Sequence, residues 1–292
     1  MMDPRDTRAL PAGIAAGVTG HTHYSTAGFS RGLVSILLPT KNEEHGLAAT
    51  FETIPIEDLT SMGFDVEVVV VDGRSKDRTL EVAADRGARI IVQEGKGKGM
   101  AIRTARRFLR GDYILMLDSD DTYPTESIPE FVEMLERGED VVMGSRLTGH
   151  IMEGAMTRTN LLGNRLLSGL ASLLYGRRCT DVCTGMWGFR REALLGIELT
   201  SREFEIEAEM FARFVKGGYR LVEVPILYRP RTGDTKLGKF RDGFLIALEL
   251  VKQRFIPHRA NPEQPSGPRD LERDAFLEEG PAASGGPTSI GS

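Results

Sequence analysis

Short apolar runs alternate with helix-type segments through the first part of the chain. Runs rich in Val, Leu and Ile cover residues 33–38, 65–71, 89–93 and 113–117, and each predicts a buried strand. Between them, residues 43–53, 77–86 and 100–109 have helical spacing of apolar positions, and Asn42 is predicted to cap the first of these helices. Strands that alternate with helices form parallel sheets covered on both faces. The pattern predicts an α/β fold with a mostly parallel central sheet and helices on both faces.

The simple alternation is lost after residue 118. Further strands are predicted at residues 140–143, 185–189 and 220–228, and helices at residues 127–137, 160–175 and 206–216. We interpret this as a nucleotide-type half followed by an acceptor-type half, fused in one domain over residues 32–256. Residues 1–31 and 257–292 are rich in Gly, Ala, Pro and Ser, and we predict flexible tails there.

Composition limits the class of protein. The chain has 292 residues, 40% of them apolar, which can fill the core of one large domain. A net charge of −5 gives no support for a nucleic-acid partner, and two cysteines are too few for a disulfide framework or a zinc site. No apolar run reaches the roughly 18 residues that a spanning helix needs, so membrane contact is predicted to be peripheral. The leucine-rich residues 160–175 and residues 240–255 could lie at a membrane interface, or serve as core helices.

A cluster of acidic residues directly follows the fourth apolar run. Asp118, Ser119 and Asp120 stand where the strand ends, and two neighbouring carboxylates repel each other unless a cation is near. Hard oxygen ligands of this kind suit Mg²⁺ or Mn²⁺ shared with a diphosphate. An acidic turn before the next helix is the alternative interpretation.

The polar loops at residues 39–42 and 72–75 should lie beside this cluster, because parallel strands end at one edge of a sheet. Asp72 ends the second run and could accept hydrogen bonds from a nucleoside, or belong to an Asp-Gly turn. Residues 95–99, with the sequence Gly-Lys-Gly-Lys-Gly, could bring backbone N–H groups and ammonium groups to phosphates. A solvated loop is the alternative for this segment.

Four segments in order resemble the family 2 glycosyltransferases, and among them the dolichol-phosphate (polyprenyl-phosphate) sugar transferases. They are residues 36–43, 70–79, 97–99 and 117–120. The resemblance implies a GT-A type fold that binds a nucleotide-diphosphate sugar, with Asp118 and Asp120 as the catalytic and metal-binding pair. The donor-binding residues that it implies are Pro39, Thr40, Asn42, Glu43, Asp72, Lys98, Asp118, Ser119 and Asp120.

The later half resembles the acceptor side of the same family. Residues 144–146, 181–189 and 223–237 carry this resemblance. Arginines of these regions hold a lipid phosphate in relatives, which implies this role here for Arg146, Arg231, Arg165 and Lys236. Two positions depart from the family pattern: Gly73 stands where many members have a second aspartate, and Thr122 where many have glutamine. Glu205 and Glu207 match the family only loosely, and we interpret them as a solvated helix start.

The resemblance implies metal-dependent, inverting transfer of a hexose, mannose or glucose, from GDP or UDP to a polyprenyl phosphate. The expected location is the cytoplasmic face of a membrane, reached directly or through a membrane partner. A phosphomonoester is already an anionic nucleophile at neutral pH and needs no strong general base. Two alternatives stay open at this point: a transferase with a soluble acceptor, such as a saccharide or a glycerate derivative, and a non-catalytic subunit that binds nucleotide sugars.

Overall fold

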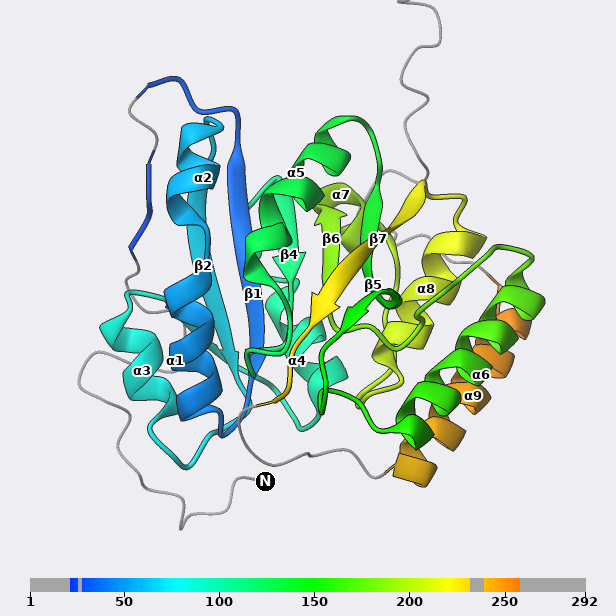
Figure 1. Cartoon of the computed structure of the whole chain (residues 1–292). Coiled ribbons are helices and arrows are strands. Elements are labelled where there is room, and N and C mark those ends of the chain that lie inside the picture. Colours follow the sequence, from blue (N-terminus) through cyan, green and yellow to red (C-terminus); the bar gives the residue numbers. More distant parts are fainter. Residues whose placement is uncertain (1–21, 26–27, 232–238, 258–292) are drawn as a thin grey trace, which may run out of the picture.

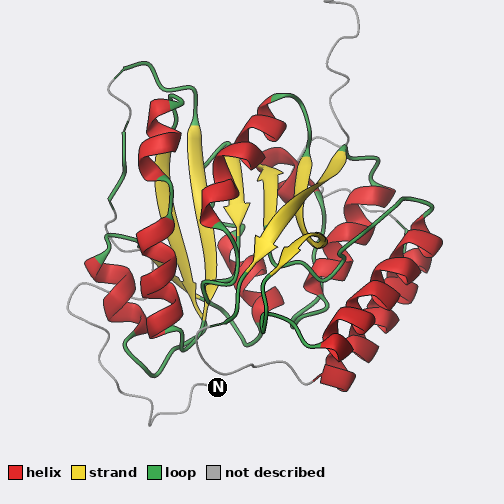
Figure 2. Ribbon diagram, viewed as in Figure 1, coloured by secondary structure: helices red, strands yellow, loops and turns green. Residues whose placement is uncertain are grey.

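One seven-stranded sheet forms the centre of the molecule, with strand order β3-β2-β1-β4-β6-β5-β7 (Figures 1 and 2). It is seen in a computed structural model that describes residues 22–25, 28–231 and 239–257. The strands are β1 (Leu33–Thr40), β2 (Asp65–Asp72), β3 (Arg89–Val92), β4 (Tyr113–Met116), β5 (Val141–Ile151), β6 (Trp187–Arg190) and β7 (Leu221–Tyr228).

The sheet is mostly parallel, as predicted. Only β6 runs against its neighbours, β4 and β5, whereas the pairs β1–β2, β1–β4, β2–β3 and β5–β7 are parallel. Thr40 pairs with Asp72, and Leu37 pairs with Met116, so the loops after β1, β2 and β4 leave the sheet at the same edge. The strand order reverses between β1 and β4, where ligands bind in open α/β sheets.

Helices cover both faces of the sheet (Figure 2). They are α1 (Glu44–Thr53), α2 (Ile56–Ser61), α3 (Thr79–Asp85), α4 (Lys98–Ala105), α5 (Ile128–Glu136), α6 (Arg158–Tyr175), α7 (Arg191–Gly196), α8 (Ile206–Lys216) and α9 (Lys239–Phe255), with a short 3-10 turn at Thr125–Ser127. The limits of α8 agree with the prediction, while α2 and α7 were not predicted. Asn42 does not cap α1: the cap position is Glu43, and the Asn42 side chain instead accepts a hydrogen bond from Lys76 N at 2.7 Å.

The strands separate two apolar cores, because successive side chains point to opposite faces. Ile36 and Leu38 of β1 pack in one core with α1, α2, α3 and α5, and Leu37 packs in the other with α4, α6, α7, α8 and α9. Full burial of each such aliphatic side chain stabilises the fold by about 2 kcal/mol. The two cores hold the strand ends, and therefore the polar loops, in fixed positions.

Helices α6 and α9 lie side by side at one end of the molecule (Figure 1). The Tyr175 hydroxyl donates to Leu250 O at 2.8 Å and joins them. Several large apolar side chains of this pair are exposed to solvent: Leu162, Leu166, Leu173, Phe244, Leu248 and Phe255. Within the described residues, no helix is both long enough and apolar enough to cross a bilayer.

Part of the predicted N-terminal tail packs against the sheet. Tyr24 exchanges two backbone hydrogen bonds with Val66 of β2, at 3.0 and 2.9 Å, and Thr22 N donates to Gly87 O. The rest of the predicted tails, residues 1–21 and 258–292, lies outside the described residues.

Candidate active site

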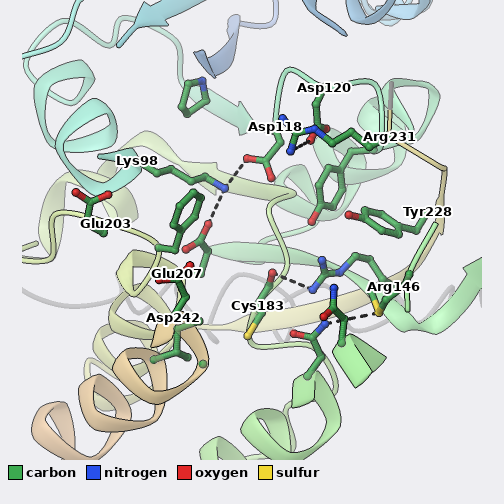
Figure 3. Close-up of a pocket in the computed structure, with 18 of the residues that line it drawn as sticks. Lys98, Asp118, Asp120, Arg146, Cys183, Glu203, Glu207, Tyr228, Arg231 and Asp242 are labelled. Atoms are coloured by element: carbon green, nitrogen blue, oxygen red, sulfur yellow. Dashed lines mark hydrogen bonds and ion pairs between the residues drawn. The ribbon is translucent and has the colours of Figure 1, made fainter. Parts of the chain in front are cut away.

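A cleft of about 1220 Å³ opens at the edge of the sheet where β1 and β4 end. Its lining starts at the loops after these strands and continues to the first half of α6 and to α9. Figure 3 shows that charged side chains from both halves of the sequence point into it. Most of the predicted donor-binding residues line this cleft: Pro39, Thr40, Asn42, Glu43, Lys98, Asp118, Ser119 and Asp120.

Asp118 and Asp120 are held by close backbone contacts. A Cβ added to Gly185 would lie 2.4 Å from Asp118 Oδ2, and one added to Gly46 would lie 2.8 Å from Asp120 Cα. Glycine at these two positions lets α1 and the segment before β6 approach the acidic loop closely. The carboxylates therefore sit at a fixed place at the mouth of the sheet.

Asp120 is surrounded by hydrogen-bond donors. The Thr122 hydroxyl donates to Asp120 Oδ1 at 2.6 Å, and Arg231 Nη1 lies 3.1 Å from Oδ2. Arg231 also forms an ion pair with Glu43. Burial, and then the charge of Asp118, raise the pKa of Asp120 above its ordinary value, although Thr122 and Arg231 oppose the shift. The acidic loop thus retains unfavourable negative charge, which a further cation would relieve.

Lys98 joins Asp118 to a second carboxylate. Its Nζ lies 2.5 Å from Asp118 Oδ1 and 2.6 Å from Glu207 Oε1 (Figure 3). The interpretation of Glu207 as a solvated residue is therefore wrong: its position on the inward face of α8 buries it. Burial alone would lower the pKa of Lys98, but the two carboxylates raise it above the ordinary lysine value, so Lys98 is charged. Burial raises the pKa of Glu207, and Lys98 opposes that shift.

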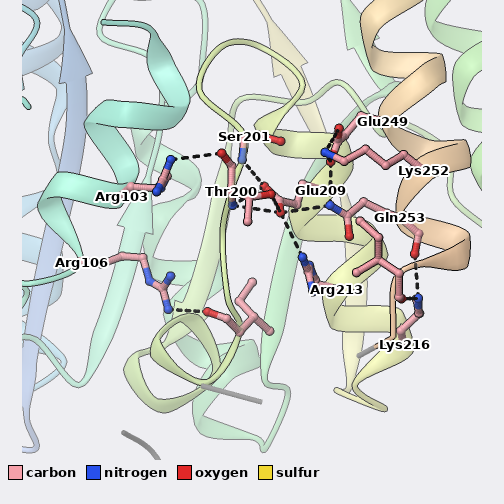
Figure 4. Close-up of polar contacts among 12 residues, drawn as sticks. Arg103, Arg106, Thr200, Ser201, Glu209, Arg213, Lys216, Glu249, Lys252 and Gln253 are labelled. Atoms are coloured by element: carbon pink, nitrogen blue, oxygen red, sulfur yellow. Dashed lines mark hydrogen bonds and ion pairs between the residues drawn. The ribbon is translucent and has the colours of Figure 1, made fainter. Parts of the chain in front are cut away.

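The glycine-lysine loop is built against residues 201–203. A Cβ on Gly97 would lie 2.3 Å from Arg202 O, and one on Gly99 would lie 2.5 Å from Ser201 O. Glu209 of α8 orders this segment by accepting hydrogen bonds from Thr200 N and from Ser201 N, the latter at 2.7 Å (Figure 4). The segment around Lys98 is therefore packed against the rest of the protein, and the alternative interpretation of a solvated loop is wrong there.

Arg146 belongs to a buried pair. Its Nε and Nη2 donate to the two carboxylate oxygens of Asp181 at 2.7 and 2.8 Å, and Nη2 also donates to Cys183 O. The guanidinium lies over the Tyr228 ring, 5.1 Å from its centroid. Burial opposes the charge, but Asp181 raises the pKa of Arg146 well above its ordinary value. Arg146 is therefore a fixed cation on the cleft wall, as the acceptor-phosphate prediction requires.

Two other predicted residues, Asp72 and Arg165, are not part of the cleft lining. The Asp72 carboxylate accepts hydrogen bonds from the backbone N–H groups of Arg74 and Ser75, as in the turn alternative, and is absent from the cleft lining. Burial raises its pKa. Arg165 is exposed on α6, because Asn164 and Leu166 occupy the turn that faces the cleft. Lys236 lies outside the described residues.

The donor set of the acidic loop fits a divalent metal ion only in part. Asp118 and Asp120 offer hard oxygen ligands at the cleft. Within the described ranges, no three or more His, Cys, Asp and Glu side chains are grouped to hold a metal. An ion held here would therefore take its other ligands from water or from donor phosphates.

Similarity to known proteins agrees with this geometry. The sequence model described as Glycosyl transferase family 2 matches residues 35–196. Glycosyltransferase AglJ of Haloferax volcanii is 40% identical over 75% of this chain and 71% of its own length. The dolichyl-phosphate hexose transferase of the same organism is 40% identical over 75% of this chain and 92% of its own.

A solved structure shares the fold. Glucosyl-3-phosphoglycerate synthase from Mycobacterium tuberculosis, in complex with Mn²⁺, UDP-glucose and phosphoglyceric acid, superposes with a TM-score of 0.63 at 22% identity, over 78% of this chain and 81% of that chain. The expected GT-A type fold is confirmed. The chain belongs to glycosyl transferase family 2, and it is a glycosyltransferase similar to the dolichyl-phosphate hexose transferases.

Proposed function

We propose that the protein transfers a hexose, mannose or glucose, from a nucleoside-diphosphate sugar to a polyprenyl phosphate at a membrane surface. The observation that carries this proposal is the combination of acidic, basic and apolar side chains that line the cleft. One end holds Asp118 and Asp120 with Arg231 beside them, Arg146 lies on the cleft wall, and the helices α6 and α9 add apolar side chains. The apolar part of the lining includes Met156, Leu162, Leu166, Leu167 and Ile246.

This combination matches the parts of a lipid phosphate reacting with a nucleotide sugar. Anionic oxygens of the acceptor are attracted to the two arginines, and the first isoprene units are favoured beside the leucines, because contact between apolar groups removes their surface from water. Leu162 and Leu166 belong both to the cleft and to the exposed apolar side chains of α6. A lipid chain can therefore leave the cleft along apolar side chains of α6. The 40% identity to a dolichyl-phosphate hexose transferase supports the same acceptor class.

In the proposed reaction, an acceptor phosphate oxygen attacks the anomeric carbon while the bond from that carbon to the nucleoside diphosphate breaks. Attack from the opposite side inverts the configuration. The phosphate, with a second pKa of about 6, is already ionised, so no side chain has to take its proton. Asp118 and Asp120 would hold Mg²⁺ or Mn²⁺, which supplies neutralisation of the leaving diphosphate. Arg146, fixed by Asp181, holds the acceptor phosphate for attack.

Transfer into lipid tests the proposal. The full chain is incubated with Mn²⁺, vesicles containing a polyprenyl phosphate, and either GDP-mannose or UDP-glucose labelled in the sugar. We expect label from one donor in the organic phase, lost by about 100-fold or more in Asp120→Asn because the loop loses a charge that acts on the leaving group. Asp121→Asn is the matched control, since Asp121 belongs to the same turn but does not line the cleft.

The other outcomes would overturn the proposal. Label that stays in water and appears on a saccharide or on phosphoglycerate would establish a soluble acceptor. Binding of the nucleotide sugar without transfer to any acceptor would establish a non-catalytic subunit.

A further inference from the structure

Asp118 and Asp120 are each paired with a cation that also contacts a second carboxylate. Lys98 lies between Asp118 and Glu207, at 2.5 and 2.6 Å. The same arrangement recurs at Asp120, where Arg231 also pairs with a glutamate of the β1 loop, Glu43. Neither cation therefore depends on the loop aspartate alone.

The Lys98 pair is enclosed. The side chains of Lys98 and Glu207 are 9% and 6% exposed, whereas Asp118 is 32% exposed toward the cleft. Ion pairs away from water are stronger than surface pairs, and breaking one by removing a partner is costly. Lys98 therefore stays near these carboxylates, and only Asp118 is open to ligands from the cleft.

A divalent cation and the Lys98 ammonium cannot both use the same side of Asp118. Mg²⁺ binds carboxylate oxygen at about 2.1 Å, so the two positive charges would be separated by only a few ångströms. Like charges at that distance repel strongly. A metal ion bound at Asp118 Oδ1 would therefore displace Lys98 from this carboxylate, and Glu207 is already in contact with the ammonium.

We propose that Lys98 is an exchangeable counter-ion of Asp118, and that Glu207 receives it when a divalent cation and a nucleoside diphosphate enter the cleft. Glu207 is thus a positioning residue that acts through Lys98. The inference rests on the proposed function only in assigning the metal and the donor diphosphate to the Asp118 end of the cleft. Released from Asp118, the ammonium remains at the cleft wall, where it can bind the diphosphate oxygens.

Direct measurement of Mn²⁺ binding tests the exchange. Free Mn²⁺ is followed by its electron paramagnetic resonance signal with the full chain, first with Mn²⁺ alone and then with GDP or UDP. In Lys98→Gln the competing cation is gone, so Mn²⁺ alone should bind about threefold to tenfold more tightly, and the nucleotide should add less to the affinity than in the wild type. In Glu207→Gln, Lys98 remains on Asp118, and Mn²⁺ should bind more weakly by a similar factor.

Two further variants separate this mechanism from general effects. Glu130→Gln removes the same charge at an exposed position in the first turn of α5, outside the cleft lining, and should leave the Mn²⁺ affinity within about twofold of the wild type. The double variant Lys98→Gln/Glu207→Gln should behave like Lys98→Gln alone if Glu207 acts only through Lys98.

Weaker Mn²⁺ binding in Lys98→Gln, or a double variant that adds the two single effects, would overturn the exchange. Thermal unfolding of each variant shows whether a loss of binding is a loss of fold, and the tighter binding expected for Lys98→Gln cannot come from misfolding. Because the measurement needs no acceptor, opposite shifts in the two variants without any lipid product would refute the acceptor class and leave the exchange intact.

Discussion

Thr122 is a buried hydroxyl whose main contact is the Asp120 carboxylate. Its side chain donates to Asp120 Oδ1 at 2.6 Å, and its backbone N–H lies 3.3 Å from the same oxygen. A hydrogen bond to the ionised form of a carboxyl favours that form. Thr122 thus keeps Asp120 available as an anion despite burial, although it stands where many family members have glutamine.

Replacement of Thr122 by Val removes this donor without changing the shape of the side chain. The pKa of Asp120 should then rise further, so Mn²⁺ binding should be lost at a higher pH on acidification than in the wild type. A pH titration of Mn²⁺ affinity measures this shift. Thr122→Ser keeps the hydroxyl and should restore the wild-type profile; an unshifted profile in Thr122→Val would contradict this account.

At this scale, sequence identified the residues that directly follow a strand. Asp118 and Asp120 were predicted because strand ends converge at one edge of a parallel sheet, whereas Lys98 was predicted from the glycine-lysine loop and from the family resemblance. Glu207 was misjudged, because its local context is an ordinary acidic helix start. Its partner Lys98 is distant in sequence, and no local pattern reports that the two meet.

Helix α8 links the cleft to α9 through two glutamates that are two residues apart and therefore point to different sides of the helix. Glu207 contacts Lys98, and Glu209 holds residues 200–201, against which the glycine-lysine loop is built. Glu209 also receives hydrogen bonds from Gln253 of α9 and from Arg213 (Figure 4). One short element therefore connects the donor end of the cleft with α9.

Glu209→Gln should lower the free energy of unfolding by about 2–3 kcal/mol, because the new amide group cannot accept the bonds that a buried carboxylate accepted. Burial alone would raise the pKa of Glu209, but the hydrogen bonds from Ser201 and Thr200 lower this pKa overall. For a carboxyl with a lowered folded pKa, the added stability exists above the unfolded pKa and is lost as the pH falls through the folded one. Urea unfolding at neutral and acidic pH should therefore show the difference between wild type and variant shrinking in acid. Glu205→Gln serves as the control, and an equal loss there would argue against a specific role for Glu209.

Helices and strands could be predicted where the periodicity of apolar residues alone is sufficient, as in α8. Strand β5 was predicted only over residues 140–143, yet it extends to Ile151. Its outer part contains exposed Thr148 and His150, and has no apolar alternation. Pairing with β7, through contacts such as His150 with Leu227, fixes this part as strand. Tertiary pairing overrides local preference there.

On the scale of the whole molecule, we propose that the exposed apolar side chains of α6 and α9 face the membrane. A substitution at Leu166, which is 66% exposed and also lines the cleft, tests this. Leu166→Glu should reduce transfer to a long polyprenyl phosphate in vesicles by about tenfold or more, since it places a charge in apolar surroundings. Nucleotide binding should be unchanged. Phe29→Glu, at a fully exposed residue before β1, is the matched control. Equal loss with a short, water-soluble isoprenyl phosphate would show that the lipid chain is not involved.

The sheet order also fixes when the cleft can exist during synthesis. Arg231 and Glu43 are 188 residues apart, and Arg229 N donates to Thr122 O at 3.0 Å just after β7 ends. A nascent chain that has reached β4 can pair β1, β2 and β3, but it exposes Asp118 and Asp120 without Glu207 or Arg231. Contacts of such long sequence separation form late and slow folding. The parallel half of the sheet can therefore emerge from the ribosome well before the active site is complete. Ligands of the cleft can stabilise only the completed chain.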